Sequence, residues 1–250
     1  MVNIKSQSEI AKLRKAGQIT GGALVAAGKA IRPGMTTKEL DNLILKYFKS
    51  HGAKAGFLGY GGFPGAACIS VNDVVIHGIP GGYVLKEGDI VSVDTGAYID
   101  GVYGDSAKTF AVGEISDEAK ALMKSTEDSL YLAISMVKPG VRLGDIGAAI
   151  QKHNEDNGFG VVREFVGHGV GHDLHEDPEV PNFGKPGHGL RLREGMVIAI
   201  EPMITAGDHA VKVLDDGWTT VTKDHSLAAH FEHTIAVTAT GCMILSDPNS

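Results

Sequence analysis

Apolar residues recur at helical spacing in two segments near the start of the chain. Each segment opens on a capping box, formed by Ser6 and Glu9 in the first case and by Thr36 and Glu39 in the second. The apolar positions are Ile10, Leu13, Ala16, Leu24 and Ala27 in the first segment and Leu40, Leu43, Ile44, Tyr47 and Phe48 in the second. This spacing predicts one long amphipathic helix and one shorter helix that is closed by Gly52.

Runs rich in β-branched residues follow the second helix and predict short strands. The expected strands are Cys68–Val71, Ile90–Asp94 and Ala97–Val112. We expect the last of them to fold into a hairpin at Asp100 and Gly101, because Asp-Gly suits a turn in which both residues have positive φ. The apolar run Ile90–Asp94 therefore ends on an aspartate before the chain turns.

The same order of elements is predicted a second time. Helices are expected at Asp117–Val137 and Leu143–Asn157, and strands around Met196–Glu201 and Val211–Val237. Two strings recur at nearly the same offset, LKEGDIVSVD as LREGMVIAIE and IRPG as VKPG, and TFAV is echoed by TIAV, in both halves shortly after an acidic residue. Chance similarity among short β-rich strings is the simpler alternative, but the near-constant offset of the first two pairs favours duplication. We expect residues 1–250 to form a single domain with pseudo-repeat halves at about 6–113 and 116–240.

Size and composition are consistent with one domain that has its own core, since 43% of the 250 residues are hydrophobic. The net charge of -7 and the absence of a Lys/Arg-rich run argue against nucleic acid as a partner. The two cysteines, Cys68 and Cys242, are too few for a disulfide framework and favour a reducing compartment. The sequence has no apolar leader or membrane-spanning window, so we expect a cytoplasmic location without membrane association.

Four carboxylates lie at matching places in the two predicted halves. Asp94 and Glu201 end matched apolar runs, while Asp105 and Glu232 precede the matched TFAV and TIAV strings. Four such groups brought together repel one another, and their pKa values rise unless cations neutralise them. Two divalent ions would balance the charge. Any one of these residues taken alone is also typical of an ordinary turn or cap.

His168 is the candidate imidazole for this set. It lies in the string VGHGVG, whose glycines allow close backbone approach and disfavour a helix. An oxygen-rich set with one imidazole favours manganese, iron or cobalt over a structural zinc site. His77 in HGIP and His175 in HEDP are candidates for a substrate-facing or ligand-supporting role. We assign no function to the other histidines outside these motifs, which are His51, His153, His188, His209, His225, His230 and His233.

Together these motifs resemble the five-ligand signature of the pita-bread metallopeptidases of family M24, and most closely its type I methionine aminopeptidase branch. The matching strings are Asp94 and Asp105 with ten residues between them, GHGVG, IEPM, EHT, HGIP, HEDP and DGW. The resemblance covers nearly the whole chain. It implies an α+β pita-bread fold, in which two pseudo-symmetric αβ halves with antiparallel sheets enclose a dinuclear metal site and the helices lie outside.

The resemblance also implies roles for individual residues. Asp105 and Glu232 would bridge two divalent ions, Asp94 would bind one ion, and His168 and Glu201 would complete the other. The implied ions are Co, Mn, Fe, Ni or Zn, with the identity left open. Glu201 is implied as a proton shuttle, and His77 and His175 as contacts to the scissile peptide. The implied pocket for a methionine side chain consists of Tyr60, Phe63, Cys68, Leu174 and Trp218.

The implied activity is removal of the initiator methionine from nascent chains when the second residue is small. The implied partners are nascent N-termini, with the ribosome as a candidate docking partner, and a monomer is expected. One alternative is an Xaa-Pro aminopeptidase or prolidase, which shares the five ligands but usually carries a further N-terminal domain. A second alternative is a binding module of the same fold without catalysis, which should lack one or more ligands.

Overall fold

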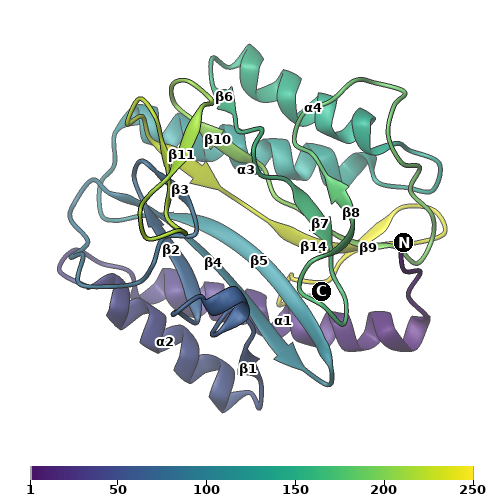
Figure 1. The fold of residues 1–250 in the computed structure, drawn as a ribbon, viewed down its shortest axis with the longest axis horizontal. Helices are drawn as coiled ribbons and strands as arrows, with labels where there is room; N and C mark the ends of the chain where they lie inside the picture. The colour runs from purple at the N-terminus through teal and green to yellow at the C-terminus, as the bar shows by residue number, and fades with distance from the viewer. Residues whose placement is uncertain (1, 250) are drawn as a thin grey trace.

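The computed structural model describes residues 2–249, in which helices lie on the outside of antiparallel β-sheets (Figure 1). The helices of this part of the chain are α1 (Gln7–Ala30), α2 (Thr37–Ser50), α3 (Asp117–Met136) and α4 (Leu143–Asp156). Figure 1 shows α1 and α2 on one side of the strands and α3 and α4 on the other. None of the helices within residues 2–249 has the length and apolarity that crossing a bilayer requires.

Both predicted capping boxes are present at the starts of α1 and α2. The Ser6 hydroxyl accepts a hydrogen bond from the backbone N–H of Glu9 at 3.3 Å, and the Glu9 carboxylate accepts from the backbone N–H of Ser6 at 2.8 Å. Thr36 and Glu39 make the same reciprocal pair at 3.1 and 2.7 Å. These bonds satisfy donors that a helix start leaves free, which is why a local signal was sufficient to predict both helices.

The strands form four antiparallel sheets in the described part of the chain. The first contains β1 (Lys54–Ala55), β4 (Ile90–Ile99), β2 (Ala67–Val71) and β5 (Val102–Ala111). The second, in the order β15-β14-β9-β7-β8, contains β15 (Cys242–Ile244), β14 (His233–Val237), β9 (Val197–Ile200), β7 (Gly167–Gly169) and β8 (Glu176–Val180). Two smaller sheets contain β11 (Val211–Val213), β12 (Thr220–Thr222) and β3 (Val74–Ile76), and β13 (Ala228–His230), β10 (Met203–Thr205) and β6 (Gly160–Val161).

Strand β4 passes straight through Asp94, so the predicted break after this residue is wrong. The strand continues to Ile99 and pairs with β5 along its whole length. Gly96, two residues beyond Asp94, is a site of close packing between the two strands, because a Cβ on Gly96 would lie 2.8 Å from the carbonyl oxygen of Gly104. The predicted hairpin at Asp100 and Gly101 is confirmed, with φ angles of 55° and 81°. Asp94 therefore projects from the middle of a rigid hairpin.

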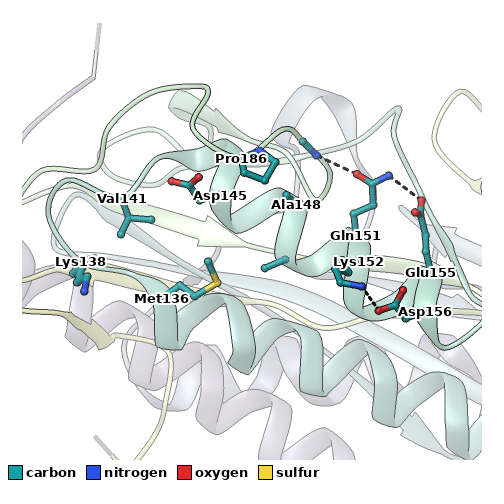
Figure 2. Close-up of a pocket in the computed structure, with 12 residues that line it drawn as sticks. Met136, Lys138, Val141, Asp145, Ala148, Gln151, Lys152, Glu155, Asp156 and Pro186 are labelled. Carbon is teal, nitrogen blue, oxygen red and sulfur yellow. Dashed lines mark hydrogen bonds and ion pairs between the residues drawn. The ribbon is translucent and has the colours of Figure 1, made fainter.

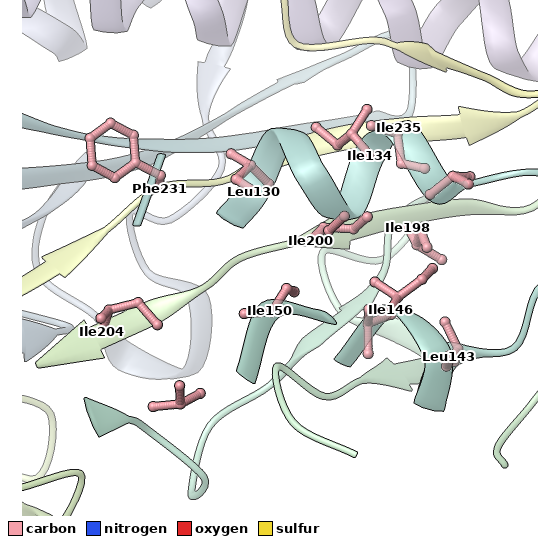
Figure 3. Close-up of a cluster of buried hydrophobic side chains, with 14 of the residues drawn as sticks. Leu130, Ile134, Leu143, Ile146, Ile150, Ile198, Ile200, Ile204, Phe231 and Ile235 are labelled. Carbon is pink, nitrogen blue, oxygen red and sulfur yellow. The ribbon is translucent and has the colours of Figure 1, made fainter. Parts of the chain in front are cut away.

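The largest apolar cluster lies between helices α3 and α4 and the five-stranded sheet (Figure 3). Leu130 on α3 and Ile146 on α4 are 1% and 0% exposed, and they pack in the same cluster as Ile198 of β9 and Ile235 of β14. Burying each such side chain contributes about 1.5–3 kcal/mol. This packing fixes the two strands whose ends carry Glu201 and Glu232. A second cluster packs α1 and α2 against β2 and β4.

Candidate metal centre and substrate pocket

The five predicted ligands come from two sheets and meet at one cavity. Asp94 and Asp105 lie on the paired strands β4 and β5, and His168 lies in the middle of β7. Glu201 directly follows β9, and Glu232 directly precedes β14. All five line a cavity of about 140 Å³.

The distances between these side chains leave space for ions at their centre. Ligand atoms of Asp105, His168 and Glu232 all lie within 4.8 Å of one another. The Nε2 atom of His168 lies 3.7 Å from Oδ2 of Asp105 and 3.5 Å from Oε1 of Glu201. Donors that share one ion at about 2.0–2.2 Å from it are themselves roughly 3–3.5 Å apart. The spacing therefore suits shared coordination better than direct hydrogen bonding.

The carboxylates fit a metal because several of their oxygens have no other partner. Asp94 Oδ1, Asp105 Oδ1 and Glu232 Oε1 are buried without a hydrogen bond. Unpaired buried polar groups are rare, and an unpaired buried charge is costly. Burial, with repulsion from the Glu201 carboxylate, raises the pKa of Asp94 to about 7, and burial raises the pKa of Glu201 to about 8. Divalent cations remove both penalties, so the residues present fit a metal centre.

His168 is held in the tautomer that a metal ligand needs. Its Nδ1 atom lies 2.9 Å from the carbonyl oxygen of Gly169, which can only accept, so Nδ1–H donates and the Nε2 lone pair is free. Burial lowers the pKa of His168 to about 4, which keeps the ring neutral. The glycines beside His168 allow the close backbone approach that the sequence predicted, because a Cβ on Gly167 or Gly169 would collide with neighbouring backbone.

His77 and His175 line the same cavity. The His175 ring lies 4.2 Å from the His168 ring between centroids, and its Nδ1 atom lies 2.8 Å from the hydroxyl oxygen of Tyr60. His77 has a φ of 58°, and its ring packs edge-on against Phe165 and Trp218 at 5.7 and 6.1 Å. A left-handed conformation at a residue other than glycine costs free energy and is frequent at functional sites.

The predicted pocket residues form an apolar wall next to the carboxylates. Tyr60, Phe63, Cys68, Leu174 and Trp218 all line the cavity. The rings of Phe63 and Trp218 meet edge to face at 5.2 Å between centroids. Asp216 accepts a hydrogen bond from the Trp218 backbone N–H at 2.9 Å and so fixes the turn that carries the indole. The structure thus brings every predicted site residue to one place.

Two residues near the cavity were not predicted. Phe57 lines the cavity and is 7% exposed. His230, for which no function was predicted, is 1% exposed and has its Nε2 atom 3.5 Å from Oε2 of Glu201. The available signal for His230 was its position two residues before Glu232, because residues at this spacing in an extended chain share a face.

A larger hollow of about 860 Å³ shares no lining residue with this cavity (Figure 2). It is lined by α4, by Met136 at the end of α3 and by the segment near Pro186. Four of its polar side chains pair with one another: Lys152 pairs with Asp156 at 2.6 Å, and Gln151 donates to Glu155 at 2.9 Å. Within residues 2–249, the side chains found clustered at metal-ligand distances do not line this hollow. The smaller cavity is the one that contains the metal-ligand cluster of Asp105, His168 and Glu232.

Comparison with known proteins agrees with this geometry. The sequence profile of metallopeptidase family M24 matches residues 11–239. A methionine aminopeptidase of Clostridium perfringens is 51% identical over 246 residues, covering 98% of this chain and 99% of the relative. Methionine aminopeptidase 1 of Bacillus subtilis is 52% identical with the same coverage.

Solved structures give the same result for the fold. The crystal structure of methionine aminopeptidase from Thermotoga maritima superposes with a TM-score of 0.97 at 51% identity and covers 98% of this chain and 99% of that one. A prolidase from Pyrococcus furiosus reaches a TM-score of 0.78 at 23% identity, with 65% of its length covered, and shares the fold. The fold is therefore the predicted α+β pita-bread fold of metal-dependent peptidases.

The chain belongs to metallopeptidase family M24, and its resemblance to the methionine aminopeptidases is confirmed. Membership of this family implies the use of divalent metal, with which the buried Asp105, His168 and Glu232 cluster is compatible.

Proposed function

We propose that this protein is a methionine aminopeptidase, which removes the N-terminal methionine from peptides and nascent proteins when the second residue is small. The observation that carries the proposal is one cavity with two different walls. One wall holds four carboxylates and His168, and the other holds apolar and aromatic side chains. Relatives about half identical over nearly the full chain bear the name of this activity.

We propose that the cavity holds two divalent ions. Asp105 and Glu232 would bridge them, because both have an unpartnered buried oxygen and both come within ligand distance of His168. Asp94 would bind one ion, and His168 with Glu201 would bind the other. When bound, such ions lower the pKa of a bound water molecule to about 7 and polarise the scissile carbonyl. Manganese, iron, cobalt, nickel and zinc all remain candidates.

Glu201 is the proposed proton carrier. Its pKa of about 8, raised by burial, shows how strongly this pocket favours the protonated acid when no cation is present. A carboxylate in such an environment can take a proton from the attacking water and return it to the departing amine. The Glu201 side chain lines the same cavity as His77 and His175, where the scissile peptide would lie.

His175 and His77 are the proposed donors to the carbonyl oxygen. If the Tyr60 hydroxyl donates to Nδ1 of His175, the proton of the neutral ring lies on Nε2, which remains the ring's free donor. Burial lowers the pKa of His77 to about 4, so this ring is neutral and also carries one N–H. Donors fixed before the reaction stabilise developing negative charge without reorganising.

The apolar wall supports methionine as the first residue. Sulfur contacts aromatic rings favourably, and an unbranched side chain adapts to a cavity bounded by Phe63, Trp218 and Leu174. The small volume of about 140 Å³ also limits what can stand next to the methionine.

We also propose a cytoplasmic site of action, on chains emerging from the ribosome, with the protein working as a monomer. Cys68 and Cys242 are both free thiols, which favours a reducing compartment. Newly made chains carry the N-terminal methionine that this activity removes.

A prolidase-like activity is the alternative, and cleavage of peptides decides between the two. Protein loaded with Co(II) or Mn(II) is incubated with Met-Ala-Ser and Ala-Pro-Ala, and release of the first residue is followed. Cleavage of Met-Ala-Ser alone supports the proposal. Cleavage of Ala-Pro-Ala alone supports the prolidase alternative, and cleavage of neither supports a binding module without catalysis.

A further inference from the structure

His230 is a buried histidine whose ring lacks hydrogen-bond partners. It ends strand β13 and is 1% exposed, and both Nδ1 and Nε2 are buried without a partner. Buried side-chain polar atoms are usually paired, and leaving one unpaired costs about 1–3 kcal/mol. The His230 ring does not line the cavity. A side chain that does line it, Glu201, lies within ion-pair distance of the ring.

The carboxylate within ion-pair distance of the His230 ring is that of Glu201, whereas Asp94 acts on the ring through its charge without an ion-pair contact. Nε2 of His230 lies 3.5 Å from Oε2 of Glu201, while the other oxygen, Oε1, lies 3.5 Å from Nε2 of His168. The carboxylate is therefore placed between two imidazoles. His168 has already used its N–H on Gly169 and offers Glu201 only a lone pair. The proton of the His230 ring has no such commitment, so His230 is the one of the two that can donate.

The backbone of His230 is fixed from the other half of the molecule. The Thr109 hydroxyl on β5 accepts a hydrogen bond from the His230 backbone N–H at 2.9 Å and donates to the His230 carbonyl at 2.9 Å. The hydroxyl of Ser92 on β4 lies 2.8 Å from the same Thr109 oxygen. Met203, two residues after Glu201, pairs directly with His230 between β10 and β13. Both ends of the His230–Glu201 contact are thus held by strands.

We propose that His230 is a positioning residue for Glu201, whose Nε2–H donates to Oε2 and leaves Oε1 to bind metal. This inference rests on the proposed metal-dependent function. A carboxylate fixed through one oxygen cannot rotate freely or turn both oxygens toward the same ion. Groups that orient a metal ligand in this way typically account for a 10–100-fold change in metal affinity or activity.

The test compares two amide variants that differ in reach. In His230→Gln the amide nitrogen extends about as far as Nε2, whereas in His230→Asn it falls short. Each variant is titrated with Co(II) by calorimetry, and the visible absorption of the bound Co(II) is recorded. We expect His230→Gln to stay within about threefold of the parent affinity, and His230→Asn to lose roughly 10–100-fold with a changed spectrum. His153→Asn is the matched control, because His153 also has a buried, unpartnered Nε2 but lies on α4, outside the cavity.

Three outcomes would overturn the inference. In the first, His230→Asn binds Co(II) with the affinity and spectrum of the parent protein. In the second, His230→Gln loses as much affinity as His230→Asn. In the third, both variants lose a whole equivalent of Co(II), which would make His230 a ligand. No substrate is present in these measurements, so failure of the parent protein to cleave Met-Ala-Ser would reject the proposed function without deciding this question.

Discussion

Lys5 Nζ lies 2.6 Å from Oε2 of Glu176, and the two side chains are only 4% and 8% exposed. The other oxygen of Glu176 accepts a hydrogen bond from the backbone N–H of His172 at 2.8 Å. Glu176 directly follows His175, so this buried ion pair ties the segment before α1 to the loop that carries a proposed catalytic histidine. We therefore expect the ion pair to contribute to the free energy of unfolding.

Lys5→Met should destabilise the protein by about 3–5 kcal/mol, because it leaves the Glu176 carboxylate buried without its cation. Urea unfolding of the metal-free protein measures this change. Lys15→Met is the matched control, since the Lys15 and Asp100 side chains are 55% and 45% exposed and their ion pair is worth about 1 kcal/mol or less. Equal stability losses in the two variants would show that the Lys5 pair is no more important than a surface contact.

Asp105→Asn should weaken metal binding by more than about 100-fold and abolish peptide cleavage, because an amide cannot supply the anionic oxygens of a bridging ligand. The metal-free variant should be at least as stable as the parent. Burial and the neighbouring carboxylates raise the pKa of Asp105 well above its usual value, and an amide resembles the protonated acid. Calorimetric metal titration and thermal melting measure the two effects.

Asp100→Asn is the control for that variant, because Asp100 lies at the tip of the same hairpin with a φ of 55°, which asparagine tolerates. It should bind metal like the parent protein. If Asp105→Asn retained full activity and two equivalents of metal, Asp105 would be only a residue of the hairpin.

His175→Ala should retain its metals and its stability within about 1 kcal/mol, while turnover falls by roughly 10²–10³ and the Michaelis constant changes much less. The reason is the loss of one donor to the charge that develops on the carbonyl oxygen. Steady-state kinetics with Met-Ala-Ser, metal titration and a melting curve are measured on the one variant. Loss of metal would make His175 a ligand, and a large loss of stability would make it a core residue.

His172→Ala is the matched control on the same loop. The His172 side chain is 60% exposed and does not line the cavity, so turnover should be unchanged. A similar fall in turnover in both variants would point to disturbance of the loop rather than to a missing donor.

The sequence predicted those features that depend on neighbouring residues. The capping boxes at Ser6 and Thr36 and the turn at Asp100 are local devices, so their residue types were sufficient. The break after Asp94 was wrong because β4 continues through Gly96, where Gly104 and Phe57 approach closely, and such contacts join residues distant in sequence. For His230 the spacing from Glu232 was the sole local signal, and its contact with Glu201 depends on the pairing of β10 with β13, which joins residues distant in sequence.

The second residue of the substrate should control cleavage. Gly, Ala or Ser should be accepted after methionine, whereas Lys, Phe or Leu should lower kcat/KM by at least about 100-fold, because a cavity of about 140 Å³ has little room beyond the first side chain. A series of Met-Xaa-Ser tripeptides with the Co(II)-loaded protein measures this dependence. Equal kcat/KM for Met-Lys-Ser and Met-Ala-Ser would contradict the expectation.

Stability of the metal-free protein should fall as pH rises from 6.5 to 8. Burial, with the Glu201 charge, raises the pKa of Asp94 to about 7, and burial raises that of Glu201 to about 8, so the folded state binds more protons than the unfolded state in this window. The buried histidines partly oppose this trend, because they are neutral in the folded state while the unfolded state still binds protons just above pH 6.5. His77 and His168, whose pKa values burial lowers to about 4, each offset about 0.4 kcal/mol in this window. Burial also raises the pKa values of Asp105 and Glu232 well above their usual range, which adds to the loss. We expect a loss on the order of 2 kcal/mol across the window.

Saturating Mn(II) should abolish this loss of stability, because the carboxylates are then ionised and neutralised throughout. Melting curves of chelator-treated and Mn(II)-loaded protein measure both trends, and parallel pH profiles for the two forms would show that these carboxylates do not hold the metal.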